Sequence, residues 1–140
     1  MLPLHEYLRT YLFLIPLFVL CATELVKILV EGLRTGNWHE RVFHPGGMPS
    51  SHSAFVMSLL IIVGHKMGME SVEFAIAFCF ACIVWYDAFG IRNMLGHQAK
   101  LINRLQKWEH LSERLGHSFK EVMAGIAFGA ALTAAGIWIS

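Results

Sequence analysis

The sequence contains little charge. Of its 140 residues, 15% are charged and 56% are hydrophobic, and the charged residues avoid several long apolar stretches. A typical soluble domain has charge at about 25% of its positions. This composition therefore excludes an ordinary soluble protein and predicts one domain, residues 1–140, embedded in the membrane bilayer. The formal net charge of +1 gives no indication of a nucleic-acid partner.

Cysteine is also scarce, and its placement argues against a disulfide framework. The three cysteines, Cys21, Cys79 and Cys82, all lie inside apolar stretches. Cys79 and Cys82 have the spacing of half a zinc site, but no second pair of ligands lies near them. No small-residue cleavage site follows the first apolar run, which predicts a retained membrane span rather than a signal peptide.

Four apolar stretches predict helices that cross the bilayer. They cover approximately residues 11–30, 49–63 or 49–66, 71–91 and 119–139. The second stretch is short, since a span needs about 20 apolar residues. The last is rich in Ala and Gly, which favours close packing against other helices. The predicted fold is an all-α integral membrane bundle of about four transmembrane helices, which leaves a homodimer open.

Residues 94–115 are too polar to span the membrane. Apolar residues recur there at helical spacing, with Lys100, Arg104 and Lys107 between them. This pattern is typical of an amphipathic helix in the membrane interface. Four spans place this segment on the same side of the membrane as residues 31–48, and most of the lysines and arginines outside the spans belong to that side. The positive-inside tendency therefore predicts that this side faces the cytoplasm.

The stretch GGMPSSHSA, residues 46–54, concentrates permissive, hydroxyl and ionisable residues beside an apolar run. The glycines free the backbone, and the apolar run predicts a helix that begins here. The first turn of a helix presents unpaired N–H groups and the positive end of the dipole, so it can bind a phosphate group. Ser50 and Ser51 would donate to the phosphate, and His52 would lie within reach as a proton donor.

Two further polar groups are expected on the same side of the bundle. Glu24 and Lys27 are three residues apart in the first span and can form an ion pair, and Arg34 follows seven residues after Lys27. Near the last span, His117 and Glu121 are four residues apart and share one helix face. A carboxylate there can accept the imidazole N–H, fix its tautomer and sharpen the other nitrogen as a nucleophile.

These groups resemble the motifs of the type 2 phosphatidic acid phosphatases, which share their active site with the vanadium haloperoxidases. GGMPSSHSA is similar to the P-S-G-H motif and resembles the signature of a small divergent branch more closely. The first family motif, K-x6-R-P, resembles Lys27-x6-Arg34 with Thr35 in place of proline, which leaves Arg41 as an alternative arginine. Ser51 stands where the family has glycine.

The third family motif, S-R-x5-H-x3-D, is more altered. His117-x3-Glu121 resembles its second half with Glu for Asp, and Arg92 resembles its arginine. Between Arg92 and His117 lie 24 residues where the family usually has five, and Gly90 stands near the expected position of the serine. The resemblance extends from Lys27 to Glu121, which is most of the chain.

The resemblance implies a membrane phosphatase that forms a phosphohistidine. His117 would be the nucleophile, Glu121 would orient it, and His52 would protonate the leaving alcohol. The residues implied to hold the phosphoryl oxygens are Lys27, Ser50, Ser51, Arg92 and either Arg34 or Arg41. The family generally needs no metal. The implied substrate is a lipid phosphate, namely phosphatidylglycerol phosphate, phosphatidate or a polyprenyl phosphate.

Other interpretations stay open. Asp87, the only aspartate in the chain, has no counterpart in these motifs. We expect it to pair with Lys27 or a histidine, and ligation of Mg²⁺ is the alternative. Taken alone, His52 is an interfacial histidine, and His117 with Glu121 is a surface pair. A protein that binds or transports lipid phosphate without turnover would keep the same pocket but would tolerate loss of His117.

Overall fold

The computed structural model describes residues 14–36, 47–113 and 115–139, and all regular structure in these ranges is helical. The helices are α2 (Leu14–Thr35), α3 (Ser51–Met67), α4 (Val72–Tyr86), the π-helix η2 (Asp87–Ile91), α5 (Arg92–Leu105) and α6 (Phe119–Ile139). Each predicted span has its helix, so the all-α bundle is confirmed. The first helix extends to Thr35, which places Arg34 on its last turn rather than in a loop.

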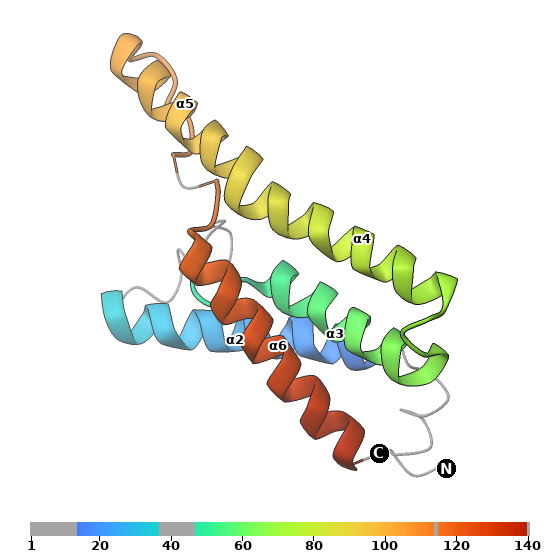
Figure 1. Ribbon diagram of the computed structural model, residues 1–140. Helices are drawn as coiled ribbons and strands as arrows, with labels where there is room; N and C mark the ends of the chain where they lie inside the picture. The colour runs from blue at the N-terminus through green and yellow to red at the C-terminus, as the bar shows by residue number, and fades with distance from the viewer. Residues whose placement is uncertain (1–13, 37–46, 114, 140) are drawn as a thin grey trace.

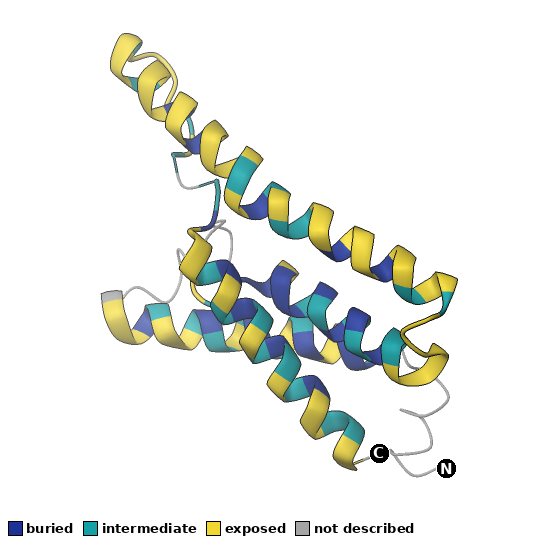
Figure 2. Ribbon diagram, in the orientation of Figure 1, coloured by how far each residue is buried: buried dark blue, intermediate teal, exposed yellow. Residues whose placement is uncertain are grey.

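The bundle is organised around α3, which packs against α2, α4 and α6 (Figure 1). Small residues allow the closest of these approaches. A methyl group added at Gly125 of α6 would collide with the Ser50 carbonyl oxygen, and one at Gly129 would lie 2.7 Å from Ala54 Cα. Buried residues therefore line α3 on several sides, whereas α4 is exposed over most of its outer surface (Figure 2). The close packing expected of the Gly-rich last helix is present.

Helices α4, η2 and α5 form one continuous rod that leaves the bundle at its α5 end (Figure 1). Of the helices in the described residues, Val72–Leu105, with 34 residues, and Phe119–Ile139 are long and apolar enough to cross a membrane. At 1.5 Å per residue the rod is about 51 Å long, against about 30 Å for the hydrocarbon core. One end of the rod therefore extends beyond a bilayer that the bundle spans.

The prediction of an amphipathic helix over residues 94–115 extends ten residues beyond the C-terminal end of the observed helix. The helix ends at Leu105, and Gln106 adopts an extended backbone. The Gln106 side chain accepts hydrogen bonds from the N–H groups of Trp108 and Glu109, which stabilises a turn. Residues 106–118, here called the return segment, run back along α5. Local bonds from a side-chain amide thus override the helical spacing of the apolar residues.

Candidate phosphate site

The start of α3 carries the serines of the GGMPSSHSA stretch. Ser50 precedes the helix with an extended backbone, and its N–H donates to the Glu121 carbonyl oxygen at 3.2 Å. Ser53 Oγ donates to Ser50 Oγ at 2.9 Å. Ser51 Oγ is buried and meets no atom of the described chain in hydrogen-bonding geometry, although the Glu24 carboxylate lies close enough to interact with it as an acceptor. A buried hydroxyl without a partner is costly, so this group is available to a ligand oxygen.

Helix α2 supplies the buried cation of the site. Lys27 is only 7% exposed, and its Nζ lies 3.1 Å from Glu24 Oε1, which confirms the predicted pair. A buried ammonium needs such a partner because it has lost its water. Arg34 is exposed two turns further along α2, about 10 Å from Lys27 along the helix axis. The alternative, Arg41, lies outside the described residues.

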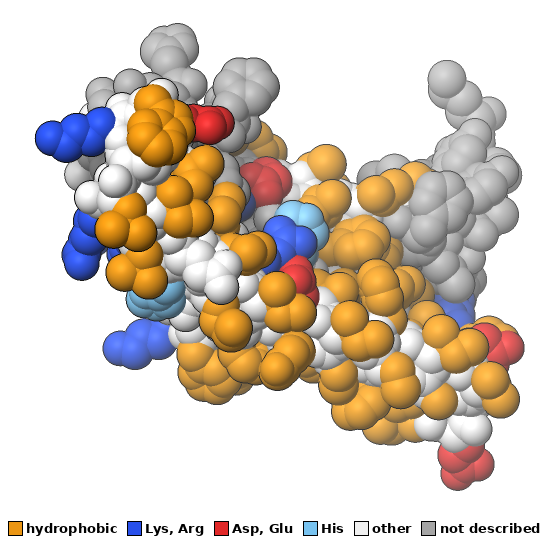
Figure 3. All heavy atoms as spheres, turned by 90° about the horizontal axis from the view of Figure 1, so that it is seen from above, with side chains coloured by type: hydrophobic (Ala, Val, Ile, Leu, Met, Phe, Trp, Pro, Cys, Tyr) orange, Lys and Arg blue, Asp and Glu red, His pale blue; other side chains and the backbone are white. Residues whose placement is uncertain are grey.

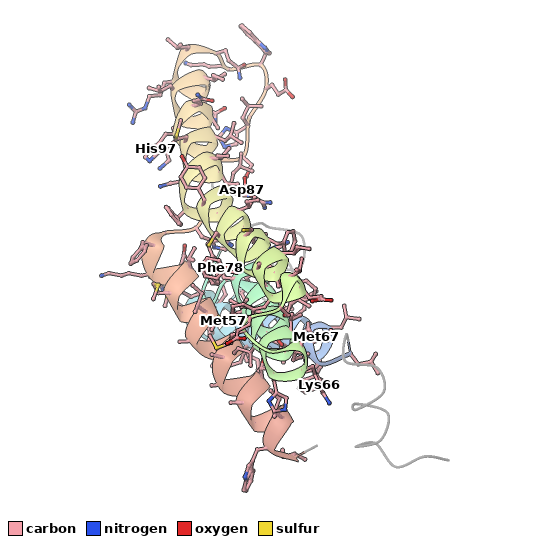
Figure 4. All side chains as sticks on the ribbon, turned by 45° about the vertical axis from the view of Figure 1, so that its right-hand side comes forward. Met57, Lys66, Met67, Phe78, Asp87 and His97 are labelled. Atoms are coloured by element: carbon pink, nitrogen blue, oxygen red, sulfur yellow. The ribbon has the colours of Figure 1, made fainter. Side chains whose placement is uncertain are left out.

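The π-helix determines the partner of Asp87. Arg92 Nε donates to Asp87 Oδ2 at 2.5 Å, so the hydrogen-bonded partner of Asp87 is Arg92, whereas we expected Lys27 or a histidine. In a regular α-helix, positions five apart point in different directions, but the wider π-turn brings i and i+5 together. Figure 4 shows Asp87 where the rod leaves the bundle. Within the described ranges, no three His, Cys, Asp or Glu residues gather as a metal site.

His117 lies beside this ion pair although 24 residues separate it from Arg92. The His117 N–H donates to the Ala88 carbonyl oxygen at 3.1 Å. The preceding residue, Gly116, packs so closely on Asn93 that an added methyl group would lie 2.6 Å from Asn93 Cα. Residues 93–116 therefore form an excursion that leaves η2 and returns to it. The two halves of the altered third motif, at Arg92 and His117, are thus brought together in space despite the long segment between them.

His117 and Glu121 are close but not hydrogen-bonded. His117 Nδ1 is buried and lies 3.6 Å from Glu121 Oε2, beyond ordinary hydrogen-bond length. The same carboxylate oxygen accepts the Ser118 N–H at 2.6 Å, and Ser118 Oγ accepts the Glu121 N–H at 3.3 Å. This reciprocal pair is a capping box at the start of α6. Glu121 therefore caps the helix, a role that the Ser118-x-x-Glu121 spacing could have revealed.

The two histidines and the charged residues form one electrostatic cluster. The charges of Arg92, Lys27, Glu24 and Asp87 all act on His52, whose side chain is exposed. Burial lowers the pKa of His117 below its ordinary value, the Glu121 carboxylate opposes this shift, and positive charge on Lys27 and His52 adds to it. Seen from above, cationic, anionic and histidine side chains adjoin within a largely hydrophobic surface (Figure 3).

Three sequence-distant groups thus meet at one end of the bundle. They are α2 at Lys27, the start of α3 with Ser51 and His52, and the junction of η2 with the start of α6. Sequence reasoning placed these residues but missed Glu24 as a neighbour of Ser51 and His52. It also missed the contact of Gly116 with Asn93, for which the sequence offers no local signal.

Comparison with known proteins identifies the family of this chain. Residues 8–132 match the Divergent PAP2 family. The chain is 33% identical over 150 residues to the uncharacterized membrane protein YuiD of Bacillus subtilis, an alignment that covers 91% of this chain and 94% of the relative. No solved structure matches the chain. The chain is a membrane protein and belongs to the Divergent PAP2 family.

Proposed function

We propose that the protein is a multi-pass membrane phosphatase that hydrolyses a lipid phosphomonoester through a phosphohistidine. The observation that carries this proposal is the hydrogen bond from the His117 N–H to the Ala88 carbonyl oxygen. It holds the His117 backbone against η2, and the buried imidazole lies within electrostatic reach of Lys27 and His52. Family membership alone would not carry the proposal, because related folds host different activities.

The first step transfers the phosphoryl group to His117. With the proton of the neutral ring on Nδ1, facing Glu121, the Nε2 lone pair attacks phosphorus. A P–N bond forms, the P–O bond to the lipid alcohol breaks, and His52 gives its proton to the leaving oxygen. The imidazole becomes positively charged, and the Glu121 carboxylate stabilises that charge. The lowered pKa of His117 supports this role, because only the neutral ring is nucleophilic.

The second step releases inorganic phosphate. Neutral His52 takes a proton from water, the hydroxyl oxygen attacks phosphorus, the P–N bond breaks and its electron pair returns to Nε2. Lys27, Arg92 and the Ser51 hydroxyl bind the phosphoryl oxygens in both steps and neutralise developing charge. Arg92 contacts Asp87 through Nε, which leaves its two Nη groups for the phosphate. These steps use no metal ion.

The position of the site limits the substrate. The rod that carries Arg92 extends beyond the membrane-spanning part at the same end as the cluster (Figures 1 and 4). Its exposed lysines and arginines suit the anionic cytoplasmic surface, where each contributes about 1 kcal/mol. We therefore propose that the site faces the cytoplasm and that the lipid headgroup enters from that leaflet. Phosphatidylglycerol phosphate, phosphatidate and polyprenyl phosphate all have the required phosphomonoester.

A second function is favoured by the distance between His117 and Glu121. Since the Glu121 carboxylate is engaged by the Ser118 N–H, the imidazole is not oriented by a hydrogen bond. A protein that binds or carries lipid phosphate without turnover needs the cations but not an oriented nucleophile. This alternative predicts saturable binding of the lipid phosphate and no release of inorganic phosphate.

Phosphate release separates the two functions. Purified protein in mixed micelles is assayed with each of the three lipid phosphates, beside the His117→Ala and His97→Ala variants. His97 is the matched control because it is an exposed histidine on α5, further along the rod than Asp87 (Figure 4). We expect turnover by wild type and His97→Ala and a loss of several orders of magnitude in His117→Ala. Saturable binding with no release by the wild type would contradict the enzyme proposal.

A further inference from the structure

The return segment is held against α5 at points that follow one another along the chain. Leu111 and Glu113 contact Asn103, Glu113 also contacts Gly96, Gly116 contacts Asn93, and His117 contacts Ala88. Each step along the return segment is thus a step back along the rod toward η2. His117 is the last residue of this series. Its position therefore depends on the register of the whole segment.

Asn103 connects α5 to the return segment by three hydrogen bonds. Its Nδ2 donates to the Leu111 carbonyl oxygen at 2.9 Å and to Glu113 Oε1 at 3.0 Å, and its Oδ1 accepts the Leu111 N–H at 2.9 Å. One side chain thus satisfies both backbone groups of a residue eight positions away. The described residues of the return segment, 106–113 and 115–118, form no helix or strand of their own before α6. These three hydrogen bonds consequently replace the ladder that regular structure would supply.

Two glycines make the register specific. A methyl group added at Gly96 would lie 2.6 Å from the Glu113 carbonyl oxygen, and one at Gly116 would lie 2.8 Å from the Arg92 carbonyl carbon. Only residues without a side chain fit at these two crossings. A slip of one residue would move His117 by about 3.5 Å. That displacement equals the whole distance between reacting atoms in a productive complex, about 3–3.5 Å.

We propose that Asn103 is a positioning residue that sets the register of the return segment and thereby holds His117 against η2. Its effect on catalysis rests on the phosphatase function proposed above. Its effect on the position of His117 does not, and can be measured separately. The segment between Arg92 and His117 then contributes to the site by positioning His117.

Hydrogen exchange at the His117 amide tests this proposal directly, because that N–H bonds to the Ala88 carbonyl oxygen across the crossing. In full-length protein in micelles, Asn103→Ala should speed exchange of this amide about tenfold or more, since three hydrogen bonds are lost. Amides in the middle of α6 should keep their protection. The matched control is Gln106→Ala, which removes the amide that stabilises the turn between α5 and the return segment but leaves the Asn103 bonds in place.

The catalytic readout is a split between kcat and KM with a rescue. Asn103→Ala should lower kcat by about 10²-fold with little change in KM, because the nucleophile is misplaced while the phosphate ligands are intact. Asn103→Asp should be equally impaired, since it places a second carboxylate against Glu113. Adding Glu113→Gln to Asn103→Asp restores a donor and acceptor between the two side chains and should recover much of the kcat.

The outcomes separate this proposal from the phosphatase proposal. If no lipid phosphate is hydrolysed by wild type, the function fails, and exchange at His117 still tests the register. Unchanged exchange and unchanged kcat in Asn103→Ala would overturn the positioning role. If Asn103→Ala does not fold, the comparison of Asn103→Asp with Asn103→Asp/Glu113→Gln decides, and the absence of rescue would contradict the proposal.

Discussion

Substitution of Gly125 by alanine tests how closely α6 must approach the GGMPSSHSA stretch. The added methyl group would collide with the Ser50 carbonyl oxygen and lie 3.1 Å from the Ser50 carbonyl carbon. Ser50 must then move by about 1 Å to reach ordinary contact. The same movement strains the hydrogen bond from the Ser50 N–H to the Glu121 carbonyl oxygen. One methyl group thus separates two of the three groups that form the site.

The expected cost follows from two opposing effects. Overpacking in a close helix contact costs about 1–3 kcal/mol, and replacing glycine by alanine in a helix regains up to about 1 kcal/mol. With the full helix gain subtracted, Gly125→Ala should destabilise the protein by up to about 2 kcal/mol. Gly136→Ala on the same helix is the matched control, because its methyl group would lie 3.8 Å from Ile15 Cγ2, an ordinary contact. This control should be as stable as wild type or slightly more stable.

Thermal unfolding in micelles and phosphate release measure the two consequences. Gly125→Ala should unfold at a lower temperature and lose about 10²-fold in kcat, since a displacement of 1 Å can cost that much. Gly136→Ala should retain both properties. If Gly125→Ala matches Gly136→Ala in stability and turnover, the close approach of α6 to Ser50 does not hold the site together.

Three further predictions concern protonation, metal and topology. Glu121→Gln keeps an acceptor for the Ser118 N–H but removes the charge that raises the pKa of His117. The acid limb of kcat/KM should therefore move to lower pH. An unmoved limb, or one at higher pH, would show that this carboxylate does not act on the nucleophile. Vanadate, which mimics the pentacoordinate phosphoryl centre, should inhibit and EDTA should not; if EDTA abolishes turnover and Mg²⁺ restores it, the metal-free mechanism is wrong. With the native cysteines replaced, an impermeant maleimide on intact cells should label Lys66→Cys and not Lys107→Cys, and the reverse pattern would place the site outside.

Much of the bundle could be predicted from apolar run length alone, because the bilayer dictates the length of a spanning segment. The Glu24–Lys27 pair followed from i, i+3 spacing on a helix and is present. The GGMPSSHSA stretch lies at the start of α3, where glycines, prolines and serines before an apolar run predict a helix N-terminus. These features depend on neighbours in the sequence, which is why the sequence reveals them.

Other features depend on contacts between distant residues. The 24 residues between Arg92 and His117 prevented a prediction of how these two residues lie relative to one another. Packing of Gly116 on Asn93 brings the two ends of that segment together. The Asp87–Arg92 pair depends on a π-turn, which no pattern in the sequence predicted. The end of α5 was misplaced because apolar spacing continued to Trp108, whereas the bonds of Asn103 and Gln106 reverse the chain. In each case a tertiary contact outweighed the local signal.

The most direct test of the central claim is to trap the phosphorylated protein. Purified protein is mixed for milliseconds with a lipid phosphate that carries a radioactive phosphoryl group, quenched in alkali and digested. The account predicts label that is stable in alkali and labile in acid, on the peptide that contains His117. Rapid release of inorganic phosphate without label at His117, or label on another residue, would contradict the account.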